Sequence, residues 1–142
     1  MKAIFCHDLP LYKDKNGVYC STTLTNSMFS RYLKVATKLI VATRVYSIEQ
    51  TYDKAHQEAL TLENLEVYKT PNMMTAKGML VERRKFKQEL RKIIKSVDLV
   101  FLRGGESANV AYEVCKEMKK PYLIECGGCA WESFWHYSLL GK

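Results

Sequence analysis

Short apolar runs alternate along this chain with segments whose apolar residues recur every three or four positions. All of the runs have the length of strands: the first is typical of a strand that is buried on both faces of a sheet, the second is rich in β-branched residues, and the third alternates toward Pro71. They cover residues 2–7, 38–46, 65–70, 97–102 and 121–125. The spacing in the other segments is typical of amphipathic helices. Helices are therefore expected over residues 21–35, 80–95 and 106–119.

Strands that are joined through helices form right-handed crossovers, which place the strands in parallel with helices on both faces of the sheet. The sequence therefore predicts an α/β fold with a Rossmann-like, doubly wound, mostly parallel sheet. Two segments fall outside the alternation. The polar residues around Gly17 predict a loop over residues 11–21, whereas residues 49–63 are ambiguous, although the stretch from Tyr52 to Leu60 has a helical period.

The size and composition of the chain indicate one globular domain over residues 1–142. Hydrophobic residues make up 47% of the chain and charged residues 26%, which excludes a disordered or collagen-like protein. The apolar run after Met1 is too short for a signal peptide, and no run reaches the roughly 20 apolar residues of a membrane-spanning helix. We therefore expect the chain to reside in the cytoplasm.

The formal net charge of +7 favours anionic partners, which include nucleic acids, phosphorylated sugars and acidic membranes, and does not choose among them. Much of the positive charge falls in the predicted helix at residues 82–95. This basic segment could lie against anionic lipid head groups or the carrier of a lipid-linked sugar. The alternative is a solvated outer face of a helix whose apolar stripe packs on the sheet.

Ligands of open parallel sheets bind beyond the carboxyl ends of the strands. Three predicted loops meet that condition, at residues 7–21, 103–107 and 125–132. The turn from Arg103 to Ser107 combines a fixed cation, two glycines and a helix amino terminus, so its backbone N–H groups could bind an anionic or hydroxyl-rich ligand. The alternative is a plain glycine turn in which Glu106 or Ser107 caps the helix.

The loop after the last predicted strand carries Glu125, Trp131 and Glu132. Ring stacking together with carboxylate hydrogen bonds is a common way to hold sugars, and this loop offers both. The alternative is that Trp131 and Trp135, four positions apart, are core or interface residues of a helix.

Five cysteines without an export signal indicate reduced thiols rather than disulfides. The Cys126-x-x-Cys129 pair between a strand and a helix would suit a thiol oxidoreductase, but it lacks the Trp and Pro of the thioredoxin pattern. A zinc site would need a second ligand pair. The dinucleotide and P-loop glycine motifs are both missing from the sequence, so no cofactor and no metal are expected. His7 is a further candidate because it falls at the carboxyl end of the first predicted strand.

The last forty residues carry several short motifs. They are Leu102 to Ala108 around the Arg103 turn, Lys120-Pro121-Tyr122, and the Trp-rich stretch from Trp131 to Lys142. Together they resemble the amino-terminal domain of bacterial capsule and exopolysaccharide glycosyltransferases of the retaining GT-B kind, similar to glycosyltransferase family 4. In topology the resemblance covers most of the chain; in motifs it covers mainly residues 99–142.

The resemblance implies that this chain is the acceptor-side half of a two-domain enzyme. A nucleotide-sugar donor would bind a carboxy-terminal domain that the sequence lacks, so the chain alone should transfer nothing. A glycan or lipid-linked sugar acceptor would bind here, with peripheral contact to the inner membrane face as a further expectation and no nucleic acid. By position, the resemblance assigns Gly17 to the donor-phosphate loop and five residues to the acceptor side: Arg103, Glu106, Ser107, Glu125 and Trp131. It identifies no catalytic residue.

Two other classes remain open at this point. One is a non-enzymatic, flavodoxin-like binding or interaction domain that is complete at this length. The other is a thiol oxidoreductase that uses Cys126 and Cys129.

Overall fold

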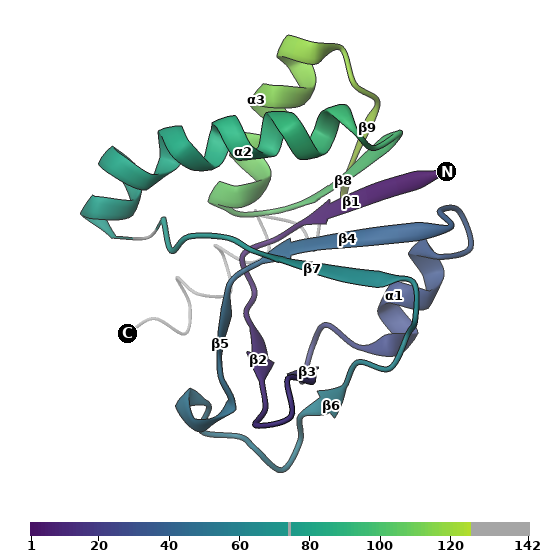
Figure 1. The fold of residues 1–142 in the computed structure, drawn as a ribbon, viewed down its shortest axis with the longest axis vertical. Helices are drawn as coiled ribbons and strands as arrows, with labels where there is room; N and C mark the ends of the chain where they lie inside the picture. The colour runs from purple at the N-terminus through teal and green to yellow at the C-terminus, as the bar shows by residue number, and fades with distance from the viewer. Residues whose placement is uncertain (74, 126–142) are drawn as a thin grey trace, which may run out of the picture.

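The computed structural model describes residues 1–73 and 75–125. Its main sheet has five parallel strands in the spatial order β7-β4-β1-β8-β9 (Figure 1). The strands are β1 (Lys2–Cys6), β4 (Lys38–Thr43), β7 (Leu65–Lys69), β8 (Leu99–Arg103) and β9 (Tyr122–Glu125). Counted along the chain, these five strands lie in the order 3-2-1-4-5, which is the Rossmann order. The predicted α/β fold with a parallel sheet is confirmed.

Helices cover both faces of this sheet, as the sequence predicted. The helices are α1 (Asn26–Tyr32), α2 (Arg83–Lys95) and α3 (Glu106–Met118). Because side chains alternate along a strand, Ala3 and Phe5 of β1 pack in the cluster with α1, whereas Ile4 and Cys6 pack in the cluster with α2 and α3. Two apolar layers therefore fix the sheet between its helices.

The predicted loop at residues 11–21 is a β-hairpin, so that expectation was wrong. Strands β2 (Leu11–Lys13) and β3 (Tyr19–Ser21) pair with each other, with β5 (Val45–Ser47) and with β6 (Glu58–Ala59), in the order β5-β2-β3-β6. The Asp14 carboxylate closes the hairpin turn by accepting bonds from the N–H groups of Asn16 and Val18. The polar turn was visible in the sequence, but its pairing with distant strands was not.

The helical period from Tyr52 to Leu60 was also misleading. This segment holds β6, preceded by the short 3-10 helix η1 (Ile48–Gln50), and Tyr52 is fully exposed. The helix expected from residue 21 begins only after Thr25, whose side chain accepts a bond from the N–H of Met28. The Ser21 hydroxyl instead accepts bonds from the N–H groups of residues 23 and 24, because Ser and Thr side chains also stabilise turns.

Helices α2 and α3 are joined by a ladder of ion pairs. Arg83 lies 2.7 Å from Glu113, Lys87 lies 3.1 Å from Glu113 and 2.8 Å from Glu117, and Arg91 lies 2.7 Å from Glu117. The cations are four positions apart, so they form one row along α2. We call these five side chains the interhelix ladder. Within the described residues, no helix is long and apolar enough to cross a membrane.

Candidate functional site

The candidate site lies where β1 and β8 end side by side. After β1 the chain turns toward the second sheet, and after β8 it enters α3 on the other side (Figure 1). This is the point at which the order of the main sheet reverses, and open α/β sheets bind ligands there. The residues at this rim are His7 and Asp8 after β1 and the turn from Arg103 to Ser107 after β8.

The carboxylate of Asp8 caps helix α3. It accepts hydrogen bonds from the backbone N–H groups of Glu106 at 2.6 Å and Ser107 at 3.3 Å. It also accepts one from the Ser107 hydroxyl at 2.5 Å, and Ser107 is fully buried. The first N–H groups of a helix carry a partial positive charge and readily bind anions. In this protein a side chain of the chain itself supplies that anion.

Gly105 allows this cap to form. Its φ of +127° lies in a region that side chains rarely adopt, and a Cβ at this position would collide with the Asp8 carboxylate. Gly104 differs, because a Cβ there would meet no atom within 4 Å. The two glycines of the turn therefore have separate roles, and only Gly105 is needed for the close approach of Asp8.

His7 ties the end of β1 to the turn after β8. Its Nδ1 lies 2.8 Å from the carbonyl oxygen of Arg103 and 3.0 Å from that of Gly104. Carbonyl oxygens only accept, so Nδ1 carries the proton and donates it. In the neutral ring this leaves Nε2 as an acceptor at a half-buried position on the rim.

Arg103 and Glu125 form a second group on the α1 face of the sheet. They are register partners in β8 and β9 and are both half-buried. One terminal nitrogen of Arg103 donates to the sulfur of Met28 at 3.2 Å. The hydroxyl of Tyr32 donates to the Glu125 carboxylate. Burial, helped by this bond, raises the pKa of Tyr32 above its ordinary value, whereas the charge of Arg103 acts in the opposite direction.

The expected site residues thus fall into separate places. Glu106 and Ser107 belong to the first turn of α3 with Asp8, and Arg103 and Glu125 lie together on the α1 face. Gly17, with a φ of +81°, lies in the turn of the β2–β3 hairpin, which Figure 1 shows at the far end of the second sheet from the main rim. Trp131 and Glu132 lie outside the described residues.

Sequence reasoning missed Asp8 and Tyr32 as members of the site. Asp8 had a signal, because it directly follows the first buried strand and such positions reach the ligand rim. Tyr32 had none beyond its place in a helical apolar stripe. Its link to Glu125, 93 positions away, depends on how α1 crosses the sheet.

The described residues contain no group of three or more His, Cys, Asp or Glu side chains that could hold a metal ion. Cys6, Cys20 and Cys115 are free and buried. Burial raises the pKa of each thiol, that of Cys115 to about 11, so these three cysteines are poor nucleophiles near neutral pH. Cys126 and Cys129 lie outside the described residues.

Comparison with known proteins shows similarity to a curated relative and to solved structures. Protein CapJ of Staphylococcus aureus is 29% identical over 146 positions, which cover 100% of this chain and 36% of CapJ. The chain therefore spans about a third of that relative. The C-terminal domain of a hydrogenase from Pyrococcus furiosus matches with a TM-score of 0.46 and 16% identity, over 88% of this chain and 89% of that domain. No family model matches the chain.

Proposed function

We propose that this chain is the acceptor-binding domain of a glycosyltransferase, which transfers a sugar from a nucleotide-sugar to a polysaccharide or lipid-linked glycan. The similarity to Protein CapJ supports a role in polysaccharide biosynthesis. The motifs around Arg103 and Lys120-Pro121-Tyr122, which resemble GT-B glycosyltransferases, support the same reading. The nucleotide-sugar would be bound by a further, carboxy-terminal domain of the complete protein.

The observation that carries the proposal is the cap that Asp8 places on α3. In dinucleotide-binding Rossmann domains the pyrophosphate binds at the amino terminus of a helix, close to the switch point where the strand order reverses. In this protein the Asp8 carboxylate already accepts hydrogen bonds from the N–H groups of Glu106 and Ser107. A second anion at this helix end would meet an existing negative charge. The rim at the start of α3 is therefore unsuited to the phosphates of the donor. A neutral, hydroxyl-rich acceptor would not be repelled by the Asp8 charge.

The group on the α1 face suits such an acceptor. Arg103 offers N–H donors, and Glu125 offers carboxylate oxygens of which one already accepts from Tyr32. A donor and an acceptor on neighbouring strands match adjacent hydroxyl groups of a sugar, and hydrogen bonds that involve charged groups are stronger than neutral ones. We assign acceptor binding to Arg103 and Glu125, and a positioning role to Tyr32.

Strand order argues against the non-enzymatic alternative in its flavodoxin-like form. Flavodoxin-like sheets have the order 2-1-3-4-5, whereas this main sheet has the order 3-2-1-4-5.

The test compares the chain alone with the chain joined to its carboxy-terminal domain. Sugar transfer should be absent from the chain alone and present in the joined protein. Titration of the chain alone should detect an oligosaccharide acceptor but no nucleoside diphosphate. In the joined protein, Arg103→Gln should raise the KM for the acceptor far more than the KM for the donor, while Arg31→Gln, at an exposed position of α1, should change neither.

Two results would contradict the proposal. One is transfer by the chain alone at a rate comparable to that of the joined protein. The other is tight binding of a nucleoside diphosphate to the chain alone.

A further inference from the structure

The chain exposes a turn of three apolar residues directly before α2. This turn is the middle of η2 (Gly78–Glu82), a π-helical segment. Its side chains Met79, Leu80 and Val81 are 57%, 82% and 64% exposed. We call these three residues the apolar turn. Gly78 is the buried residue of η2, and a Cβ on it would collide with the carbonyl oxygen of Asn72. The close backbone packing of Gly78 leaves the residues after it outside the core.

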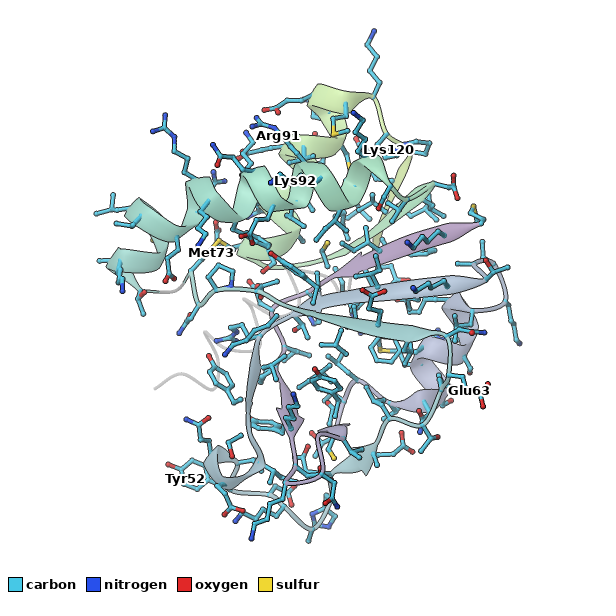
Figure 2. The ribbon with its side chains drawn as sticks, viewed as in Figure 1. Tyr52, Glu63, Met73, Arg91, Lys92 and Lys120 are labelled. Carbon is cyan, nitrogen blue, oxygen red and sulfur yellow. The ribbon has the colours of Figure 1, made fainter. Side chains whose placement is uncertain are left out.

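The cations of α2 divide into two rows. One row is Arg83, Lys87 and Arg91, which the interhelix ladder pairs with α3. The second row forms no ion pair with any described residue, and all its members are exposed. It consists of Arg84, Lys85, Lys92 and Lys95. We call this second row the basic face; its Lys92 and the paired Arg91 are both labelled on α2 in Figure 2.

Among the described residues, two carboxylates lie beside the basic face, and both are next to Lys85: Glu82 and Glu89 line the same pocket as that side chain. Glu89 is the acidic residue within α2, and its carboxylate accepts a hydrogen bond from the hydroxyl of Tyr68. Glu82, at the end of η2, is half-buried. Arg84 and Lys92 lie eight positions apart on the same side of the helix, with the exposed amide Gln88 between them. The apolar turn therefore continues into an exposed helix face of positive charge.

We propose that the apolar turn and the basic face together bind the surface of an anionic lipid bilayer. Three apolar side chains are far fewer than the roughly 20 residues needed to span a bilayer, but they suit shallow insertion at the level of the head groups. The cations beside them attract anionic head groups, each strengthening binding by about fivefold. A nucleic acid would pair with the cations but would leave the apolar turn in water, so the combination favours a membrane.

The position of this surface agrees with an acceptor that is carried by lipid. Helix α2 follows β7 and α3 follows β8, so both helices begin at the carboxyl edge of the main sheet (Figure 1). The apolar turn is therefore on the same edge as Asp8 and Arg103. Membrane binding itself does not rest on the proposed transfer activity, because it is measured without donor or acceptor.

The experiment is flotation of the protein with lipid vesicles, one set of phosphatidylcholine and one with about a third of phosphatidylglycerol. The protein should float with the anionic vesicles and bind the neutral ones at least tenfold more weakly. Arg84→Gln with Lys92→Gln should weaken anionic binding by about thirtyfold. Val81→Ser and Leu80→Ser should each weaken it by about fivefold to tenfold. Circular dichroism and thermal unfolding confirm that each variant is folded.

Matched controls lie elsewhere on the surface. Val35→Ser removes a valine that is 56% exposed in the turn after α1, and Lys15→Gln with Lys34→Gln removes two exposed cations. These controls should bind within twofold of the unchanged protein. The proposal is overturned if the unchanged protein does not float, if Val81→Ser and Val35→Ser bind alike, or if duplex DNA displaces the vesicles at equal charge concentration.

Discussion

The Asp8 carboxylate and the buried hydroxyl of Ser107 are hydrogen-bonded at 2.5 Å across 99 positions of the chain. Asp8 accepts in addition from the backbone N–H of Ser107 at 3.3 Å. The pair joins the end of β1 to the first turn of α3, so it both holds the switch point together and supplies the negative charge at the helix end. Its removal should therefore be visible in stability and in anion binding.

Asp8→Ala should lower the free energy of unfolding by about 2 kcal/mol, because a helix loses its cap and a buried hydroxyl loses its acceptor. Urea unfolding followed by circular dichroism measures this change. Asp53→Ala removes a carboxylate that is 54% exposed and bonded to His56, and it should cost less than about 0.5 kcal/mol. Equal losses of unfolding free energy in the two variants would show that the Asp8 cap stabilises the fold no more than an exposed carboxylate does.

The same substitution should create an anion site. Without the carboxylate, the N–H groups of Glu106 and Ser107 are free to bind a phosphate at the start of α3. Millimolar inorganic phosphate should therefore raise the melting temperature of Asp8→Ala by several degrees more than that of the unchanged protein. Chloride at equal ionic strength is the reference. An identical phosphate response in both proteins would contradict the assigned role of Asp8.

Gly105→Ala should be much more harmful than Gly104→Ala. The first places a Cβ against the Asp8 carboxylate at a φ of +127°, whereas the second meets nothing within 4 Å. We expect a loss of about 2 kcal/mol for Gly105→Ala and less than about 0.5 kcal/mol for Gly104→Ala. The measurement is the urea unfolding midpoint of each variant under the same conditions. Similar midpoints for the two variants would refute the prediction that only Gly105 is required.

The interhelix ladder should make the protein sensitive to acid. Hydrogen bonds from Arg83 and Lys87 lower the pKa of Glu113, and those from Lys87 and Arg91 lower the pKa of Glu117. A carboxyl group with a lowered pKa in the folded state stabilises it above its unfolded pKa, near 4.3, and loses that contribution as the pH falls further. Stability should therefore decline below about pH 4.5.

The matching measurement is the urea midpoint as a function of pH. In the double variant Glu113→Gln, Glu117→Gln the decline should be shallower, whereas Glu63→Gln, which removes an exposed carboxylate outside the ladder, should leave it as it is. High salt should also flatten the decline, since the partners are partly exposed and therefore screened. A double variant with an unchanged pH profile would contradict the prediction.

At alkaline pH the relevant groups are Tyr32 and Tyr68. The pKa of each phenol is raised above the ordinary value near 10. The larger cause is burial, and the second is the hydrogen bond to Glu125 for Tyr32 and to Glu89 for Tyr68. The unfolded chain then ionises before the folded one, so stability is complete below about pH 10 and is lost as the pH rises past it. Tyr32→Phe should reduce this alkaline loss.

Two measurements between about pH 9 and pH 11 test this prediction. Ultraviolet absorbance of phenolate reports the ionisation of the tyrosines, and the urea midpoint reports the loss of stability. Tyr52→Phe serves as the control, because that side chain is fully exposed. If Tyr32→Phe and Tyr52→Phe lose stability equally steeply, the buried bond between Tyr32 and Glu125 has no part in the alkaline response.

The sequence located those features that depend on neighbours along the chain. The apolar runs that became β1, β4 and β8 were recognisable, because strands in the middle of the sheet are buried on both faces and must be apolar throughout. The edge strands β7 and β9 are more exposed and were recognisable as short runs bounded by turn residues. Helix α2 was recognisable from its stripe of Phe86, Leu90 and Ile94. The turn after β8 was also identified as a place where ligands could bind. Once the parallel order was inferred, its position at the rim followed from general topology.

Features that join distant segments could not be predicted from the pattern of neighbouring residues. The second sheet brings β2 and β3 to β5 and β6, and its strands are only two or three residues long. Strands that short carry too few residues to show a period. The period from Tyr52 to Leu60 pointed to a helix, and pairing with β3 decided against it.

By itself, then, the sequence determined the fold class, the five core strands and the glycine turn, since burial demands a local pattern of apolar residues and backbone freedom demands glycine. The tertiary structure alone decided that Asp8 fills the anion position of α3, that Arg103 and Glu125 share the α1 face, and that one row of cations on α2 has no ion pair with any residue the structure describes. These relationships depend on which residues from separate strands and helices meet, up to 99 positions apart in the case of Asp8 and Ser107. Side-chain contacts of that kind form only when the strands and helices have packed.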